Sequence, residues 1–393
     1  MTGSPKGWMD TADPPSVRAA KLMNEMTLDE KLFMFHGSST GYVGGVQANT
    51  RLGIPALHYN DGPQGFRDNS FLGSTTSFPS GLTIGATFDV VAAQQWGSAM
   101  GKEFFLKGAN VQLGPGMCIA RVPRNGRNFE YIAGEDPFLG YTMVGPVIEG
   151  IQSQNVIANA KHWVNNNQET NRQSSTKSDS ADVDERTEFE IYYPPFKGAC
   201  DWFIAPRYFS PHPRRVQAPR SHLSLFLSLS LSLLPFSSPL SPSLPLPLSL
   251  MLGAIDAGVG SIMCSYNEIN DHWSCENPQT LQKDLKDTLG FKGWVMSDWG
   301  ATHSASMNAG LDQEMPGGSY MGDKLAALVK AGTVPMSKVN DSTMRILTPM
   351  FEMKLFDIPN NNTQKNNVTV RDGCCYFLTL HTYLTYLLTY LLT

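Results

Sequence analysis

Apolar side chains recur at helical spacing near the start of the chain. Val17–Asn24 and Leu28–Phe35 each repeat apolar residues every three or four positions, which gives a helix one apolar face. Thr27 and Glu30 form a Thr-x-x-Glu capping box, in which each side chain satisfies a backbone N–H group of the other residue. The pattern predicts two helices, the second of which begins after Thr27.

Short apolar runs follow, and each run leads through a polar or glycine-rich loop into a helical stretch. Largely apolar runs are typical of parallel strands buried on both faces, and their alternation with helices is typical of β/α units. Seven runs are visible and an eighth is obscure; the seven are Pro55–Asn60, Leu82–Ala86, Ala109–Leu113, Val156–His162, Gly260–Tyr266, Gly293–Asp298 and Ala309–Asp312. Helical patterns over Lys324–Lys330 and Val339–Met353 follow the last run.

The number of runs favours a closed barrel over an open, doubly wound sheet. No Gly-x-Gly-x-x-Gly fingerprint follows the first run, as a dinucleotide-binding sheet would require. The length of 393 residues is enough for one large barrel or for two ordinary domains. We therefore expect the fold class α/β, with a TIM-type (β/α)8 barrel.

One internal segment does not fit the β/α pattern. Residues 221–252 are almost entirely Leu, Ser and Pro. Each Pro in a helix interior costs about 3 kcal/mol, so low complexity is a better interpretation than a transmembrane helix. Joining residue 199 directly to residue 255 restores an amphipathic helix that runs through Gly into a buried strand. We therefore predict that Cys200–Ala254 is a translated intron or gene-model error inside a barrel formed by residues 1–199 and 255–356.

The end of the chain raises the same question. Residues 357–393 begin like a linker and end in a short tandem repeat of Tyr, Leu and Thr, which we interpret as an aberrant low-complexity tail. The start has no apolar run of signal-peptide length, so we expect either a cytosolic protein or a missing true start.

Charge and cysteine content narrow the partners. The net charge of -5, without a basic stripe outside the low-complexity segment, argues against a nucleic acid or an anionic membrane as partner. The six cysteines show no Cys-x-x-Cys pair and no Cys/His cluster at zinc spacing, so we expect no metal and no cofactor. The oligomeric state is left open.

Chemically active side chains gather where the predicted strands end, which is where the active site of a β/α barrel lies. Asp61 ends a run and Arg67 follows it; Arg127 lies in a later loop; Lys161 and His162, Tyr266, and the pair Asp298 and Trp299 end three further runs. This mixture suits a sugar ring, with hydrogen bonds to its hydroxyls and an aromatic ring against its apolar face. Asp298 could attack the anomeric carbon, and neighbouring cations such as Lys161 would hold it ionised.

Six motifs in this order resemble the family 3 glycoside hydrolases, above all their fungal- and plant-type β-glucosidases. They extend over about Val17–Phe356, interrupted only by the suspected insert. The matching stretches are Asn60–Arg67, Gly126–Glu130, Gly134–Gly140, Ala160–Glu169, Met263–Asn267 and Ser297–Trp299. The stretch Trp163–Asn167 replaces the His-containing loop of the members that cleave N-acetylglucosaminides, which argues against that substrate.

The resemblance implies a retaining exo-β-glucosidase acting on β-glucosides or cello-oligosaccharides, with Asp298 as the nucleophile. It implies that the sugar-binding subsite is formed by Asp61, Arg67, Arg127, Lys161, His162, Tyr266 and Trp299, with Met263 packing at its edge. In the family the acid/base Glu comes from a second α/β sandwich domain, which we expect to be absent after Phe356. One alternative is therefore a truncated barrel with weak or no activity. A second alternative is a β-xylosidase. Members of the family are often secreted or vacuolar.

Structural roles compete with functional ones at several of these positions. Lys161 and His162 could be a structural pair, and Arg67 and Arg127 could form ion pairs rather than bind sugar. For five acidic residues a structural role is the better interpretation, namely Glu130, Glu135, Asp136, Glu169 and Glu314. The role of Arg172 is left undecided. Cys264 and Cys275 flank a strand-end loop and could form a disulfide or remain free buried thiols.

Overall fold

The computed structural model describes residues 6–68, 74–172, 179–197, 255 and 257–358. The suspected insert at residues 200–254 and the tail beyond Ile358 lie outside the described residues. The interpretations of those two segments therefore stay predictions.

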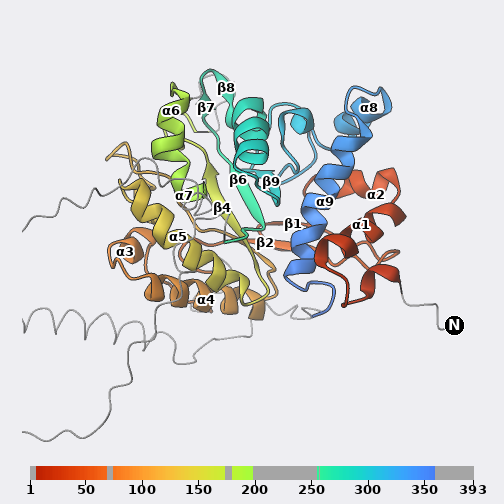
Figure 1. The fold of residues 1–393 in the computed structure, drawn as a ribbon, viewed down its shortest axis with the longest axis horizontal. Helices are drawn as coiled ribbons and strands as arrows, with labels where there is room; N and C mark the ends of the chain where they lie inside the picture. Colours follow the sequence, from red (N-terminus) through yellow and green to blue (C-terminus); the bar gives the residue numbers. More distant parts are fainter. Residues whose placement is uncertain (1–5, 69–73, 173–178, 198–254, 256, 359–393) are drawn as a thin grey trace, which may run out of the picture. The chain divides into compact units, whose positions relative to one another are not determined.

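The centre of the fold is a six-stranded sheet in the order β1-β2-β3-β4-β6-β9 (Figure 1). β1 is antiparallel to β2, and every later neighbour in the sheet is parallel. The strands are β1 (Gly44–Val46), β2 (Leu57–Asp61), β3 (Val111–Leu113), β4 (Ile157–Trp163), β6 (Ser261–Cys264) and β9 (Trp294–Ser297). Five of the seven predicted runs coincide with parallel strands, so the chain is an α/β protein in which half of the expected barrel is seen as a sheet.

Helices flank this sheet (Figure 1). In Figure 1, α4 and α5 lie together on one side of the sheet, and α1, α2, α8 and α9 lie on the other. The α-helices are α1 (Pro15–Glu25), α2 (Leu28–Phe33), α3 (Gly81–Gly85), α4 (Val90–Leu106), α5 (Pro137–Gln152), α6 (Glu185–Thr187), α7 (Pro194–Lys197), α8 (Asp323–Lys330) and α9 (Met336–Glu352). The predicted helices near both ends are confirmed, as is the capping box, in which Thr27 and Glu30 exchange hydrogen bonds.

Shorter elements complete the fold. A second sheet has the order β5-β7-β8, with β5 (Ser180–Ala181), β7 (Glu268–Ile269) and β8 (His272–Trp273). The 3-10 turns are η1 (Gly7–Met9), η2 (Asn128–Glu130), η6 (Ser274–Glu276) and η8 (Ser306–Ala309), and the π-helical segments are η3 (Glu188–Tyr192) and η7 (Gln279–Thr288).

The predicted strand at residues 82–86 is wrong, because this segment forms helix α3. Ser80 caps the helix by accepting a hydrogen bond from the Thr83 backbone N–H at 3.2 Å. Gly81 and Gly85 let the helix approach the backbone of the loop after β3, since a Cβ atom at Gly85 would lie 2.2 Å from the Ile132 carbonyl oxygen. A short apolar run bounded by glycine carries no reliable period, and tertiary packing decides its structure.

The predicted strand at residues 309–312 is also not a regular strand. The segment begins in turn η8 and passes through Gly310 with φ 113°. It contacts β9 through the Asp312 N–H, which donates to the Val295 carbonyl at 2.9 Å, and the next residue forms the isolated bridge Met296–Gln313. The Ser297 backbone N–H donates to the Gln313 carbonyl at 2.9 Å. A further bridge joins Glu314 to His36, so the pairing continues beyond β9 as isolated bridges rather than as strands.

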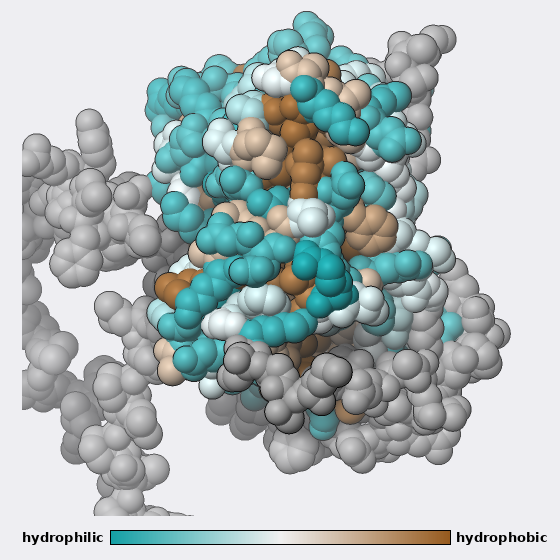
Figure 2. Space-filling model, turned by 90° about the vertical axis from the view of Figure 1, so that its right-hand side faces the viewer, coloured by the Kyte–Doolittle hydropathy of each residue, from teal (hydrophilic) through white to brown (hydrophobic). Residues whose placement is uncertain are grey.

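The core combines apolar side chains from the strands with a few buried polar contacts. Trp163 and Trp294 are fully buried, and Lys286 forms an ion pair of 2.8 Å with Asp312 in the same interior. Figure 2 shows the face that bears α1, α2 and α9, where apolar side chains lie exposed between hydrophilic ones. Within the described part of the chain, none of the helices combines the length and apolar character that a membrane crossing requires.

Cys264 and Cys275 form a disulfide, with their Cα atoms 5.2 Å apart. The sequence left open whether these cysteines form a disulfide or remain free thiols, and the structure has the disulfide. The bond joins the end of β6 to turn η6, so it fixes the loop that carries Tyr266.

Candidate active site

Asp298 is the first residue after β9 and is held by the neighbouring backbone. Its N–H donates to the Cys264 carbonyl at 3.2 Å, and its Oδ1 atom accepts from the Trp299 N–H at 2.8 Å. The residue is only 7% exposed, yet its Oδ2 atom has no hydrogen-bond partner among the described residues. A buried carboxylate oxygen without a hydrogen bond is costly and is therefore a mark of a functional position.

Burial raises the pKa of Asp298, because a charged carboxylate loses its hydration inside the protein. Lys161, Arg172, the Trp299 backbone N–H and Arg127 act in the opposite direction and favour the ionised form. The expectation that Lys161 helps to ionise Asp298 therefore has the right sign, but burial is the larger effect and the pKa of Asp298 lies above its usual value.

His162 is almost completely buried beside Asp298, with its Nε2 atom 3.4 Å from Asp298 Oδ2. Arg127 Nη2 lies 3.1 Å from the same Nε2 atom, and Tyr131 Oη lies 3.2 Å from Nδ1. A guanidinium group can only donate, so Nε2 must accept and Nδ1 must carry the proton. Burial, followed by the charges of Arg127, Lys161 and Arg172, lowers the pKa of His162 well below its usual value, and the ring is neutral.

A cavity of about 450 Å³ opens between the strand ends. Four of the predicted sugar-binding residues line it, namely Asp61, Arg67, Arg127 and Lys161. Arg67 Nη1 donates to Asp61 Oδ2 at 2.7 Å. Thr76, which also lines the cavity, is anchored by its N–H, which donates to the buried carboxylate of Glu103 at 3.0 Å. Arg67 and Arg127 thus form ion pairs and also line the cavity, so the two roles weighed for them are not exclusive.

Tyr266 and Trp299 lie on the Asp298 side of the site. The Tyr266 hydroxyl donates to the Trp299 carbonyl at 2.7 Å, and Trp299 Nε1 donates to the Val43 carbonyl at 3.2 Å. Gly44 on β1 leaves room for the indole, since a Cβ atom there would lie 2.6 Å from Trp299 Cζ2. Met263 is buried on β6 next to Met296 of β9. Five of the predicted site residues do not line the cavity of Asp61, namely His162, Met263, Tyr266, Asp298 and Trp299. Arg127 connects these residues with the cavity, because it lines the cavity and contacts His162.

Two residues in the loop after β4 belong to the site although the sequence did not single them out as ligands. Arg172 Nη2 lies 3.7 Å from Asp298 Oδ2, and its guanidinium group lies 4.2 Å above the Tyr266 ring. Glu169 contacts both Arg172 and Arg127, at 2.6 Å and 3.5 Å. Glu169 ends the matching stretch Ala160–Glu169, and for Arg172 the position shortly after the Lys161–His162 pair was the signal that could have identified it.

Tyr131 was missed altogether. It is fully buried, and its hydroxyl accepts a hydrogen bond from Asn166 Nδ2 at 3.2 Å in addition to contacting His162. A single buried tyrosine in a loop has no periodicity or spacing that distinguishes it from a core residue. Glu314, by contrast, accepts hydrogen bonds from the backbone N–H groups of Tyr320 and Met321, at 2.9 Å and 2.7 Å, which holds the loop between them.

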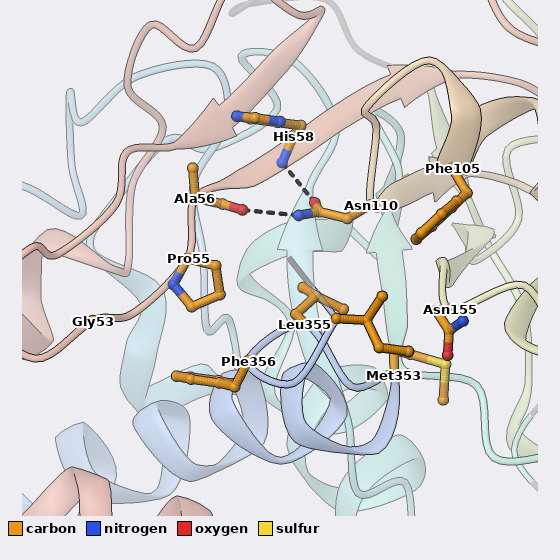
Figure 3. Close-up of a pocket in the computed structure, with 11 residues that line it drawn as sticks. Gly53, Pro55, Ala56, His58, Phe105, Asn110, Asn155, Met353, Leu355 and Phe356 are labelled. Carbon is orange, nitrogen blue, oxygen red and sulfur yellow. Dashed lines mark hydrogen bonds between the residues drawn. The ribbon is translucent and has the colours of Figure 1, made fainter. Parts of the chain in front are cut away.

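A second cavity of about 240 Å³ lies at the opposite ends of the strands, where β2 and β3 begin (Figure 3). The Asn110 amide in its wall accepts from the His58 N–H at 2.7 Å and donates to the Ala56 carbonyl at 2.8 Å. These contacts stabilise the loops that precede the strands. Among the described residues, no three His, Cys, Asp or Glu side chains come together in a way that would hold a metal ion.

A parallel sheet that presents a buried carboxylate, cationic side chains and aromatic rings at its strand ends is typical of glycoside hydrolases. Residues 38–202 and 250–349 match the model of the glycosyl hydrolase family 3 N-terminal domain. The chain therefore belongs to glycosyl hydrolase family 3 and so to the class of glycoside hydrolases.

Its relatives include two curated fungal enzymes. The chain is 34% identical over 371 residues to beta-glucosidase A of Aspergillus kawachii, which is 87% of the chain and 36% of that protein. It is 34% identical over 371 residues, with the same coverage, to beta-glucosidase 1 of Aspergillus aculeatus. The chain thus spans little more than a third of the length of these curated relatives.

Solved structures give the same result. DesR, a beta-glucosidase from Streptomyces venezuelae in complex with D-glucose, matches with a TM-score of 0.68 and 31% identity over 88% of this chain and 39% of that one. Beta-D-glucoside glucohydrolase from Trichoderma reesei matches with a TM-score of 0.71 and 29% identity over 95% of this chain and 44% of that one.

Proposed function

We propose that this chain carries the nucleophile and the sugar-binding subsite of a retaining exo-β-glucosidase. The observation that carries the proposal is the buried Asp298 carboxylate, whose Oδ2 atom has no hydrogen-bond partner among the described residues and faces the neutral His162 ring. A nucleophilic carboxylate needs a free oxygen, and the cations around the site can stabilise its charge. The names of the relatives, all β-glucosidases, support glucose as the sugar.

In the proposed reaction, Asp298 Oδ2 attacks the anomeric carbon of the terminal glucosyl residue and displaces the aglycone. The resulting glycosyl ester is then hydrolysed by water, which returns the carboxylate and releases glucose with retained configuration. Asp61, Arg67, Arg127, Lys161, His162 and Tyr266 would bind the sugar hydroxyls, Trp299 would lie against the apolar face of the ring, and Met263 would pack at the edge. The general acid is assigned to none of the described residues.

We also propose that the sheet is part of a (β/α)8 barrel and that residues 200–254 interrupt it. The bridges Met296–Gln313 and His36–Glu314 support the first statement, because they continue the pairing beyond β9 towards the segment before β1. The family match supports the second, because it leaves out residues 203–249. Sequencing the transcript tests the insert directly.

The function is tested with an aryl β-glucoside that has a good leaving group, such as 2,4-dinitrophenyl β-glucoside. Such a substrate needs little acid assistance, so it reports on Asp298 even where the general acid is absent. Asp298-dependent turnover by the chain as printed, and by a version without residues 200–254, is the expected result. Turnover that is unchanged in Asp298→Ala would refute the assignment of Asp298 as the nucleophile. Absence of turnover in both chains would favour the alternative of an inactive barrel.

A further inference from the structure

Glu169 connects the two arginines that lie closest to Asp298. Arg172 Nη1 donates to Glu169 Oε2 at 2.6 Å, and Arg127 Nη1 lies 3.5 Å from Glu169 Oε1. Asn166 Nδ2 donates to the same Oε1 atom at 3.3 Å, which fixes the carboxylate from its own loop. Glu169 therefore holds Arg172 closely and contacts Arg127 more loosely.

Arg172 lies at long ion-pair distance from Asp298 and forms no hydrogen bond with it. Its Nη2 atom is 3.7 Å from Asp298 Oδ2, whereas a charge-assisted hydrogen bond would require about 2.7–2.9 Å. The guanidinium group is held back by Glu169 on one side and lies over the Tyr266 ring at 4.2 Å on its face. A movement of about 1 Å would close the ion pair with Asp298.

Among the other charged groups around Asp298, Arg127 has partners of its own. Arg127 also binds Glu130 and His162, so it keeps two contacts if Glu169 is lost. Lys161 and the neutral His162 face Asp298 from strand β4. Among the described residues, the side chain of Arg172 would keep only the Tyr266 ring and Asp298 as partners, so we expect it to move towards Asp298.

We propose that Glu169 is a positioning residue that holds Arg172 away from Asp298 and so keeps the Oδ2 atom open for attack on the sugar. Without this restraint, Arg172 closes on Asp298, and the resulting ion pair lowers the basicity of the carboxylate and blocks the attacking oxygen. The catalytic consequence rests on the proposed function, but the position of Arg172 is a property of the free protein.

The first test measures the pKa of Asp298 directly. The full chain is labelled with ¹³C at the aspartate carboxyls, the Asp298 signal is assigned with Asp298→Asn, and the signal is titrated. Glu169→Gln is expected to lower the pKa by about one unit, a tenfold change in the ionisation constant. Glu190→Gln, at an exposed position paired only with Arg186 among the described residues, should leave it unchanged.

A double-mutant cycle separates the restraint from the loss of a negative charge, which also lowers a neighbouring pKa. If Arg172 moves, Glu169→Gln has a much smaller effect in a protein that carries Arg172→Met. If the effect is equal in both backgrounds, the charge of Glu169 acts directly and the proposal is overturned. Glu169→Asp keeps the charge and shortens the side chain, so it must also lower the pKa of Asp298. This variant replaces Glu169→Gln in the test if Glu169→Gln does not fold.

Turnover provides the second test. With the aryl β-glucoside, Glu169→Gln and Glu169→Asp should reduce kcat about tenfold or less while KM changes little, and should move the acid limb of the pH profile to lower pH. A residue that only stabilises the loop would not move that limb, and a fixed limb contradicts the proposal. If the unaltered chain shows no Asp298-dependent turnover, the proposed function fails, but the titration still decides the role of Glu169.

Discussion

The Nε2 atom of His162 lies 3.4 Å from the Oδ2 atom of Asp298, and the proton of the imidazole is on the far nitrogen. The ring therefore faces the carboxylate with a lone pair rather than with a positive charge. Burial keeps His162 neutral and raises the pKa of Asp298, so the nearest side chain does not hold the nucleophile in its ionised form. That task falls to the cations further away, above all Lys161.

The acid limb of the pH profile of kcat/KM should therefore lie at a pH above the ordinary aspartate pKa of about 3.9. Asp298 must be ionised to attack, so activity falls as the pH drops through its raised pKa. The measurement is kcat/KM for the aryl β-glucoside between pH 3.5 and pH 8. An acid limb at or below the ordinary value would contradict the assignment of Asp298 or its environment.

Lys161→Met should move this limb to higher pH, because it removes the largest of the charges that lower the pKa of Asp298. It should also reduce kcat/KM by about 10- to 100-fold, the value of a charge-assisted hydrogen bond of roughly 1.5–3 kcal/mol. Lys330→Met, an exposed position at the end of α8, is the matched control. Equal effects of the two substitutions would show that Lys161 has no special role.

Several of the elements that the sequence predicted correctly are apolar runs that lead to a polar end. β2, β4 and β9 each bury their apolar residues and deliver Asp61, the Lys161–His162 pair and Asp298 at the predicted positions. Such a pattern is local, so it can be recognised without the fold. The run at residues 82–86 is as short as the run at residues 109–113, and glycine bounds both, so its packing against the loop after β3 decided that it forms a helix.

Arg172 and Glu169 illustrate the other limit. They lie in a loop, where no period constrains them, and Arg172 becomes a neighbour of Asp298 and Tyr266 only when β4, β6 and β9 are aligned. The sequence could suggest that charged residues near the Lys161–His162 pair mattered. It could not determine which of them point at the nucleophile, since that depends on contacts between distant segments.

Gly44→Ala should disturb Trp299, because the new Cβ atom would lie 2.6 Å from Trp299 Cζ2 and the indole must move. The expected results are a change in tryptophan fluorescence and a fall in kcat/KM of roughly tenfold, about 1.4 kcal/mol of lost binding to the sugar. Gly317→Ala is the control, since a Cβ atom there has no heavy atom within 4 Å. Normal kcat/KM in Gly44→Ala would mean that the position of Trp299 is not critical for the substrate.

Lys286→Met should destabilise the protein strongly. Lys286 and Asp312 are almost fully buried and lie 2.8 Å apart, and Asp312 also accepts hydrogen bonds from the Val295 N–H and the Ser342 hydroxyl. Removing the lysine leaves a buried charge without its counter-ion, which costs about 3–5 kcal/mol. Arg186→Met removes the exposed partner of Glu190 and should cost less than about 1 kcal/mol. Urea unfolding at pH 7 compares the two, and similar losses would contradict this account of the buried pair.

Glu188→Gln should stabilise the protein at alkaline pH. Burial raises the pKa of Glu188 to about 7, Asn165 opposes this shift with a hydrogen bond, and Asp284 and Asp184 add to it. The folded state therefore binds the proton of Glu188 more tightly than the unfolded state, whose glutamate pKa is about 4.3. The stability contributed by this proton is complete below about pH 4.3 and is lost as the pH rises through 7.

At pH 8, a neutral amide at this position should avoid the cost of a buried carboxylate, a gain on the order of 3–4 kcal/mol, and the gain should shrink to about 1 kcal/mol near pH 5. The expected measurement is the free energy of unfolding of both proteins at pH 5, 6.5 and 8. Glu190→Gln, two residues away but exposed, should show no such pH dependence. A gain that is the same at all three pH values would show that the substitution acts through packing next to Asn165 rather than through the proton. The result matters for the site because Asn165 begins the loop that carries Glu169 and Arg172, so loosening at high pH would reach the neighbours of Asp298.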